Sequence, residues 1–319
     1  MTTDFVVAAT RRLPPACEQR LTLEHTFRPG DDDAVYSPAL LAEHAKDADA
    51  LLVTPLEKIS ADVIAALPPK LKIIATCSAG YEHIDLEAAR ARGIHVTFAP
   101  GVMTDATADI ALLLILAASR RATEATQLIR SGSWTGVRLT SMLGCQITGK
   151  TLGIVGLGRI GMAVALRAQA CGMKILYYNR TALKNPPQSM TAMSSLEELL
   201  SRSDVLSLHC PSTPESEKLL NRESIKLLPD GAIIINTARG ALIDDYALIE
   251  SLQSGKIFAA GLDVYANEPA LDPRYMTLEN VFALPHIGSA TLESRTALCM
   301  AAIENIDAVL SNRPPINSV

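Results

Sequence analysis

The sequence predicts an α/β protein with parallel β-sheets and about two domains, and three observations support this fold class. Short apolar segments of strand length alternate with helix-forming segments, a rhythm typical of parallel βα units. The segment from residue 150 to 172 combines an apolar strand, a turn with three glycines and a helix. The length of 319 residues exceeds one typical core, which favours about two domains.

The first third of the chain contains four strand candidates separated by helix candidates. The strands are predicted at residues 5–10, 50–54, 71–75 and 94–97, and the helices at 14–25, from 38 onward, at 61–67 and at 85–92. Ser37 before Pro38 is a helix-start signal, because serine caps a helix and proline fits its first turn. Ser60 is predicted to cap the next helix, and Gly93 to end the last one of this series.

A long helix is predicted over residues 104–129, after a hinge candidate at Ala99–Gly101. Its apolar run from Ile110 to Ala118 is too short to span a bilayer and indicates a buried helix. Residues 133–149, which include the single tryptophan Trp134, are predicted to be irregular. A second series follows, with strands at 151–155, 174–178, 205–209, 232–236, 259–264 and 281–284, and helices at 195–201, 221–227, 244–253 and 291–310.

Composition and charge exclude several classes of partner. With 48% hydrophobic and 20% charged residues, the chain is typical of a globular protein. The net charge of −5 gives no electrostatic reason to bind nucleic acid or an anionic membrane, so we expect neither as a partner. The first residues, MTTDFVVAATRR, lack the pattern of a secretory signal. Six scattered cysteines without a C-x-x-C pair predict neither a disulfide framework nor a metal site, and they indicate a cytoplasmic protein.

The turn after the strand at 151–155 carries the motif G-x-G-x-x-G, at Gly156, Gly158 and Gly161. The first glycine permits a tight turn, the second lets the backbone approach a pyrophosphate, and the third lets the helix pack closely on the strand. The N-terminus of the helix then favours the bound anion. Because the motif lies between a strand and a helix, it predicts a dinucleotide-binding site of the Rossmann type.

Three charged residues follow predicted strand ends in the second series: Arg239, Glu268 and His286. Ligands of open parallel sheets bind outside the carboxyl ends of the strands, so these side chains are placed to converge near the nicotinamide end of a dinucleotide. Each also has a plain structural interpretation. An arginine in a loop is often solvated, a glutamate beside proline often lies at the surface, and a histidine often serves packing. Together, downstream of a dinucleotide motif, they predict a catalytic group.

Six segments carry a resemblance to a known family. They are SAGYEHIDLEAARARGI (78–94), TDATADIALLLILAASRR (104–121), GKTLGIVGLGRIG (149–161), INTARGALID (235–244), AAGLDVYANEP (259–269) and LPHIGSAT (284–291). On these segments the chain resembles the D-isomer-specific 2-hydroxyacid dehydrogenases, and within them it is most similar to the bacterial NADPH-dependent glyoxylate/hydroxypyruvate reductases. The resemblance implies two Rossmann-like domains with parallel sheets. A cofactor domain, residues 100–286, would be inserted into a discontinuous, flavodoxin-like substrate domain formed by residues 1–99 and 287–319.

The resemblance also implies the roles of the site residues in an oxidoreductase that reduces a 2-keto acid to a D-2-hydroxy acid. Arg239 would bind the substrate carboxylate, which its planar guanidinium fits better than a lysine would. His286 would give a proton to the carbonyl oxygen, and Glu268 would orient the imidazole and raise its pKa. The loop Ser78, Ala79 and Gly80 would supply backbone N–H donors to the carboxylate, and Ser289 would also contact the substrate.

A further set of positions would bind the cofactor. These are Thr107, Gly156, Leu157, Gly158, Arg159, Ile160, Gly161, Asn179, Arg180, Thr181, His209, Cys210, Pro211, Thr237, Ala238, Arg239, Asp263, His286 and Gly288. Where NAD-dependent relatives have an acidic residue for the ribose hydroxyls, the strand KILYYNRT ends in Asn179, followed by Arg180 and Thr181. An arginine and a hydroxyl would bind a 2′-phosphate that a carboxylate would repel. We therefore expect a preference for NADPH. The alternative is that the protein uses NADH as well.

Several alternatives remain open from the sequence. Relatives that prefer glyoxylate or hydroxypyruvate often carry a second tryptophan after the position of Trp134, and this chain has none from Val137 to Leu143. A larger 2-keto acid such as 2-ketogluconate is therefore an alternative substrate, and formate or phosphite is a narrower one. A non-catalytic, dinucleotide-sensing binding protein is the runner-up function. The resemblance also implies a homodimer formed through residues 104–145, although the apolar helix there would serve equally as core.

Overall fold

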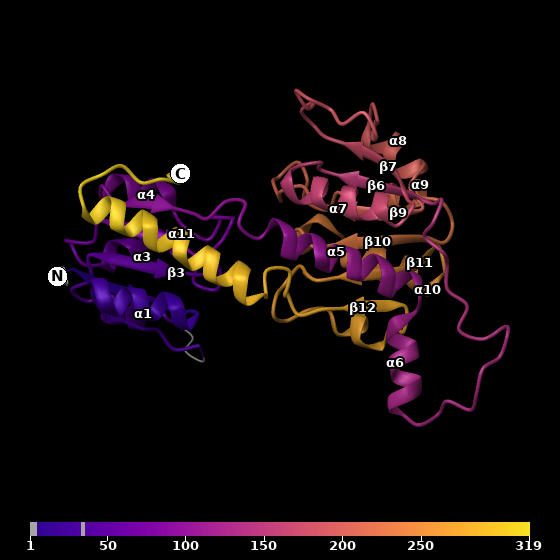
Figure 1. Cartoon of the computed structure of the whole chain (residues 1–319), viewed down its shortest axis with the longest axis horizontal. Helices are drawn as coiled ribbons and strands as arrows, with labels where there is room; N and C mark the ends of the chain where they lie inside the picture. Colours follow the sequence, from indigo (N-terminus) through magenta and orange to yellow (C-terminus); the bar gives the residue numbers. More distant parts are fainter. Residues whose placement is uncertain (1–4, 33–35) are drawn as a thin grey trace. The chain divides into compact units, whose positions relative to one another are not determined.

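The computed structural model describes residues 5–32 and 36–319, and it divides into two compact units (Figure 1). Unit 1 consists of the described residues up to Met103 together with Ser289–Val319, and unit 2 consists of Thr104–Gly288. Each unit is built around a parallel sheet, so the predicted α/β fold class is confirmed. The start of the N-terminal segment interpreted above, residues 1–4, lies outside the described residues.

The chain passes between the units at Met103–Thr104 and at Gly288–Ser289, whereas the sequence analysis expected 99/100 and 286/287. Val102 stays with unit 1, where its carbonyl accepts a hydrogen bond from the Ser294 hydroxyl at 3.4 Å. Ile287 and Gly288 stay with unit 2, because their N–H groups donate to the two carboxylate oxygens of Asp263 at 2.8 and 2.7 Å. These hydrogen bonds link each crossing segment to its own unit, and no local sequence pattern encodes them.

Unit 1 has a five-stranded sheet in the order β2-β1-β3-β4-β5, with all neighbours parallel. Its strands are β1 (Val6–Ala9), β2 (Thr26–Arg28), β3 (Ala50–Val53), β4 (Ile73–Thr76) and β5 (His95–Thr97). Its helices are α1 (Pro15–Glu24), α2 (Pro38–His44), α3 (Ala61–Ala66), α4 (Leu86–Ala91) and α11 (Leu292–Leu310). Strand β2 was missed by the sequence analysis, since its three residues include no continuous apolar run.

The predicted helix start at Ser37 and helix end at Gly93 are confirmed, and Ser60 is confirmed in position only. The Ser37 hydroxyl accepts a hydrogen bond from Leu40 N–H, and Gly93 ends the last helix of the series with a left-handed φ of +68°. Ser60 precedes α3 as predicted, but its side chain makes no capping hydrogen bond. Helix α11 comes from the far end of the chain and packs against α1 and β4 (Figure 1).

Unit 2 has a seven-stranded parallel sheet in the order β12-β11-β10-β9-β6-β7-β8. Its strands are β6 (Thr151–Val155), β7 (Lys174–Tyr178), β8 (Thr191–Ala192), β9 (Val205–Leu208), β10 (Ala232–Asn236), β11 (Ile257–Leu262) and β12 (Val281–Ala283). Its helices are α5 (Thr104–Ser119), α6 (Ala122–Arg130), α7 (Arg159–Ala170), α8 (Leu196–Ser201), α9 (Arg222–Leu227) and α10 (Asp245–Gln253), with short 3₁₀ turns at Gly240–Leu242 and Pro273–Thr277. The chain winds outward in both directions from β6, which creates a switch point between β6 and β9 where ligands of such sheets bind.

The single long helix predicted over residues 104–129 is wrong, because α5 and α6 are separate helices. Arg121 adopts a left-handed φ of +54° between them. The Ser119 carbonyl, which a continuous helix would use internally, accepts Cys145 N–H at 2.8 Å instead. The chain that returns after the irregular segment therefore ends α5. Among the described residues, none of the helices has the length and apolar character needed to cross a membrane.

Candidate active site

The glycine turn after β6 lies at the switch point and packs against the end of β9. Gly156 has a φ of +93°, and a Cβ there would come within 2.8 Å of the Cys210 backbone nitrogen. Gly161 is equally constrained, since its Cβ would lie 2.4 Å from the Gly156 carbonyl oxygen. Gly158 differs, because a Cβ there would point into open space. Helix α7 begins directly after Gly158 without a side-chain cap, which leaves its N-terminus suited to an anion.

The residues that follow β7 lie next to the glycine turn. The Asn179 side-chain oxygen accepts Leu157 N–H at 2.6 Å, so this amide is bonded to the glycine turn. Arg180 and Thr181 follow at the surface. The Arg180 guanidinium lies 3.6 Å from the carboxylate of Glu215, and both side chains are exposed. Glu215 was missed by the sequence analysis, because the segment after Pro211 offers no signal that it faces Arg180.

Two polar side chains after β9 and β10 extend the same edge of the sheet. His209 hydrogen-bonds the Ser207 hydroxyl through Nε2 at 2.8 Å. Burial lowers the pKa of His209 to about 4, so its ring is neutral near pH 7. The Thr237 hydroxyl is buried and has no hydrogen-bond partner among the described residues. An unpaired buried hydroxyl is costly, and a bound ligand would relieve it.

Asp263 binds the last two residues of unit 2 through its carboxylate. Its carboxylate is buried and accepts the N–H groups of Ile287 and Gly288. Burial raises the Asp263 pKa, and these two hydrogen bonds only partly oppose the rise. A Cβ at Gly288 would lie 3.1 Å from the Asp263 carboxylate and 3.4 Å from the Thr107 methyl group. The structure thus brings Thr107, Asp263 and Gly288 together.

The sequence-predicted histidine and glutamate form a direct pair. His286 Nδ1 lies 2.6 Å from Glu268 Oε2, and the other carboxylate oxygen accepts Tyr265 N–H at 2.8 Å. The His286 side chain is 54% exposed, and its backbone has a left-handed φ of +53°. No described residue hydrogen-bonds its Nε2. One ring nitrogen is therefore fixed by the carboxylate, and the other is available to a ligand.

The electrostatics of this pair favour a protonated imidazole. The hydrogen bond to Glu268 is the largest influence on His286 and raises its pKa, against the effects of partial burial and of the Arg239 charge. For Glu268, burial alone would raise the pKa. The hydrogen bonds from His286 and Tyr265, together with the charge of Arg239, lower it below its ordinary value. The pair therefore consists of an imidazolium and a carboxylate over a wider pH range than free side chains would allow.

Arg239 is exposed, and its loop is fixed from beneath by residues that the sequence analysis did not single out. Buried Asn236 donates from its side-chain amide to the Arg239 carbonyl at 2.9 Å and accepts Ala238 N–H at 3.0 Å. A Cβ at Gly240 would lie 1.9 Å from the Tyr265 carbonyl carbon, so only glycine lets the two loops touch. The sequence signal that could have identified Asn236 and Gly240 is the segment INTARG, in which an asparagine ends the strand and a glycine follows the arginine.

The remaining residues predicted to bind substrate belong to unit 1. The Ser78 hydroxyl hydrogen-bonds the Thr76 hydroxyl at 2.9 Å and the Gly80 carbonyl, so it serves the loop itself. Among the described residues, nothing accepts the N–H groups of Ala79 or Gly80, which leaves these two donors available. Ser289 lies just before α11, where its carbonyl accepts Thr291 N–H at 2.8 Å.

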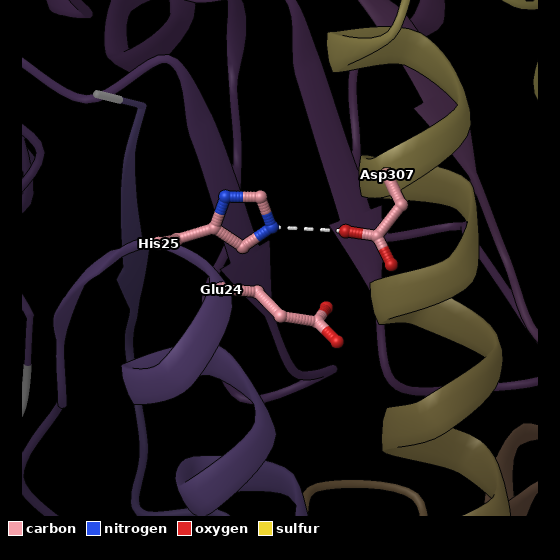
Figure 2. Close-up of side chains that lie close together, drawn as sticks. All are labelled: Glu24, His25 and Asp307. Carbon is pink, nitrogen blue, oxygen red and sulfur yellow. Dashed lines mark hydrogen bonds and ion pairs between the residues drawn. The ribbon is translucent and has the colours of Figure 1, made fainter. Parts of the chain in front are cut away.

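A second cluster of titratable groups lies in unit 1, where Glu24, His25 and Asp307 approach one another (Figure 2). His25 Nε2 lies 2.9 Å from Asp307. The Arg20 guanidinium lies 2.5 Å from the other Asp307 oxygen and 3.2 Å from Glu24. Arg20 already supplies the positive charge that these carboxylates need, so the cluster is an ion-pair network that joins α1 to α11.

Fold and site geometry together define a Rossmann-type dinucleotide-binding oxidoreductase. The donor set fits the cofactor of that class, on two observations: the open space at Gly158 and the unpartnered Thr237 hydroxyl.

Comparisons with known proteins identify the family. A model of the D-isomer specific 2-hydroxyacid dehydrogenase, NAD binding domain, matches residues 112–288. The chain is 41% identical to a glyoxylate reductase from Thermococcus litoralis, over 98% of this chain and 96% of that protein. It is also 41% identical to a glycerate dehydrogenase from Hyphomicrobium methylovorum, over 95% of each. An NADPH-dependent glyoxylate/hydroxypyruvate reductase from Sinorhizobium meliloti matches in structure with a TM-score of 0.87 at 31% identity, covering 99% of this chain and 97% of that one. The chain belongs to the D-isomer specific 2-hydroxyacid dehydrogenase family.

Proposed function

We propose that this protein uses NADPH to reduce a short 2-keto acid, glyoxylate or hydroxypyruvate, to the corresponding D-2-hydroxy acid. The observation that carries the proposal is the His286–Glu268 pair at 2.6 Å, with one imidazole nitrogen available and with Arg239 close enough to influence both pKa values. The names of the related reductases support the choice of substrate.

The proposed mechanism assigns one task to each side chain. Bound NADPH supplies the hydride. His286 donates a proton from Nε2 to the carbonyl oxygen, and Glu268 keeps the imidazole protonated and oriented through Nδ1. Arg239 binds the substrate carboxylate with its planar guanidinium and stabilises negative charge on the carbonyl oxygen. The free N–H groups of the loop 78–80 and the Ser289 side chain add donors to the substrate.

The cofactor is proposed to occupy the edge of the unit 2 sheet. The glycine turn and the start of α7 would hold the pyrophosphate, and Asp263, Thr107 and Gly288 would lie by the nicotinamide. The segment 209–211 and the residues Thr237 and Ala238 would line the space between. In this proposal, unit 2 (Thr104–Gly288) is the cofactor domain, and unit 1 is the substrate domain.

The preference for NADPH is proposed from the end of β7. The Asn179 amide is bonded to Leu157 N–H and carries no charge that would repel a 2′-phosphate. Arg180 and Thr181 are exposed beside it and offer a cation and a hydroxyl. Glu215 works against this preference, since its carboxylate competes for Arg180. We therefore propose that NADPH is preferred and that NADH is used less well.

Two further properties are proposed, one from exposed apolar side chains and one from the cysteines. A homodimer formed through residues 104–145 is supported by the exposed apolar side chains of α6 and the segment after it. These are Ile129, Trp134, Val137, Leu139 and Leu143. A monomer mass in sedimentation equilibrium would contradict the dimer. A cytoplasmic location is supported by the six free cysteines.

A panel of 2-keto acids assayed with NADPH and with NADH tests the proposal. We expect the highest kcat/KM with glyoxylate or hydroxypyruvate, and higher values with NADPH than with NADH. A preference for 2-ketogluconate, or turnover of formate or phosphite, would change the substrate while keeping the chemistry. Tight NADPH binding without turnover of any compound would favour the dinucleotide-sensing binding protein instead. Equal or better use of NADH would contradict the cofactor preference.

A further inference from the structure

Unit 1 contains a cluster of three thiols that the proposed mechanism does not use. Cys299 on α11 lies between Cys77, directly after β4, and Cys17 on α1, and all three contribute to one apolar cluster. The Cys77 and Cys299 sulfur atoms are 3.5 Å apart. The Cys17 thiol interacts with Cys299 and also donates to the Thr296 carbonyl at 3.6 Å. The cysteines are far apart in sequence, so the sequence analysis treated them as scattered.

The three thiols differ in access to solvent. Cys77 is partly exposed, whereas Cys299 is 6% exposed and Cys17 is fully buried. The hydrogen bond with Cys17 lowers the Cys299 pKa, but contact with Cys77 and burial outweigh it and raise that pKa above its ordinary value. Cys299 is therefore a poor first target for an oxidant, and Cys77 is the accessible one.

The position of Cys77 gives its oxidation a consequence. It directly precedes Ser78, and its own N–H bonds the Val53 carbonyl at 2.9 Å, at the carboxyl edge of the sheet. The loop that follows carries the free N–H groups of Ala79 and Gly80. A disulfide bond is only about 2.05 Å long, so closing it would draw the Cys77 and Cys299 sulfur atoms together by roughly 1.5 Å. Any part of this closure that side-chain rotation does not take up shifts the Cys77 backbone, which is the start of the loop.

We propose that Cys77 and Cys299 form a reversible disulfide when the protein is exposed to hydrogen peroxide, and that this bond displaces the loop 78–80. The Cys77 thiolate attacks one peroxide oxygen, the O–O bond breaks, and Cys77 becomes a sulfenic acid while the other oxygen leaves as water after gaining a proton. The Cys299 sulfur then loses its proton and attacks the Cys77 sulfur. The S–S bond forms, the S–O bond breaks, and a second water leaves. Two thiols are oxidised as one peroxide is reduced to two waters.

The first test follows the bond itself and does not depend on the proposed function. The reduced full-length protein is treated with hydrogen peroxide, blocked with N-ethylmaleimide, digested and analysed by mass spectrometry. We expect a peptide pair linked through Cys77 and Cys299 that dithiothreitol separates. Cys77→Ala and Cys299→Ala should abolish it, and Cys17→Ala should retain it. A link between Cys17 and Cys299, or irreversible oxidation of Cys77 alone, would overturn the proposal.

The second test follows the loop. Oxidation should change hydrogen exchange of residues 78–83, and dithiothreitol should restore it. A kinetic readout is added, and only this readout rests on the proposed function. Oxidation should raise KM for the keto acid by up to about 10²-fold, which is the usual cost of misplacing a binding group by ~1 Å. The affinity for NADPH should not change. A linked protein with unchanged exchange and KM would overturn the effect on the loop. A reduced protein without keto-acid turnover would refute the proposed function alone, since exchange still decides the effect on the loop.

Discussion

Two histidine–carboxylate pairs in this molecule are chemically alike and structurally different. In unit 1, His25 lies 2.9 Å from Asp307, between α1 and α11 (Figure 2). In unit 2, His286 lies 2.6 Å from Glu268, beyond the ends of β12 and β11. The His25 side chain is 6% exposed, while the His286 side chain is 54% exposed.

The difference lies in what surrounds each pair. Asp307 also binds Arg20, so its charge is already balanced within the helix pair. His286 has one nitrogen without a partner among the described residues, and its left-handed backbone is the kind of strain that concentrates at functional sites. A short histidine–carboxylate distance therefore does not identify a catalytic pair. Our proposal of a catalytic role for His286 rests on its open nitrogen and on its position at the carboxyl edge of a parallel sheet.

Replacing each histidine separately should give opposite results. His286→Ala should reduce kcat by about 10²–10⁴-fold, the usual contribution of general acid–base catalysis, with little change in stability. His25→Ala should leave kcat unchanged and lower the free energy of unfolding by about 1–3 kcal/mol, because Asp307 loses a partner. Steady-state kinetics and denaturant unfolding measure both. Comparable losses of kcat in the two variants would remove the distinction.

The same kind of comparison can be made between two exposed arginines of unit 2, Arg239 and Arg222. Arg239→Ala should lower kcat/KM by ~10–150-fold, mainly through KM, since a charge-assisted hydrogen bond is worth about 1.5–3 kcal/mol. Arg222→Ala is the matched control, because Arg222 is an exposed arginine of the same unit paired with Glu250 at 2.5 Å. It should have no effect on the kinetics. Wild-type KM in Arg239→Ala would rule out its role in binding the carboxylate.

The smallest expected effect concerns cofactor choice. Glu215→Gln should raise the ratio of kcat/KM for NADPH over NADH by up to about fivefold, because an exposed ion pair contributes at most ~1 kcal/mol. Arg180→Ala should lower the same ratio. Glu223→Gln is the control, since Glu223 is an exposed glutamate paired with Lys226 on the same unit. If Glu215→Gln leaves the NADPH/NADH ratio of kcat/KM unchanged, Glu215 does not influence cofactor choice.

Sequence reasoning predicted what depends on local pattern. The glycine turn, the strand segments and the three charged residues at strand ends each carry a signal within a few residues. The split between α5 and α6 carries no such local signal, because it depends on a hydrogen bond from the distant Cys145 N–H to the Ser119 carbonyl. Short strands such as β2 and β8 exist through pairing with neighbours and have no apolar run of their own.

The supporting residues of the site were hidden for the same reason. Asn236 acts by bonding the loop that carries Arg239, and Gly240 acts by admitting the backbone of Tyr265. Glu215 faces Arg180 across a turn that no spacing encodes. Contacts between segments distant in sequence decide such roles, and a single sequence does not reveal them.

The pH dependence of kcat/KM for keto-acid reduction, in the wild type and in Glu268→Gln, tests the central claim most directly. Because Glu268 raises the His286 pKa, the imidazolium persists above the ordinary histidine pKa, and activity should fall only as pH rises through the raised value. In Glu268→Gln the fall should begin at lower pH. Arg239, Asp263 and the remaining groups are unchanged in this variant. An alkaline limb that does not move would contradict the claim that Glu268 keeps His286 protonated as the proton donor.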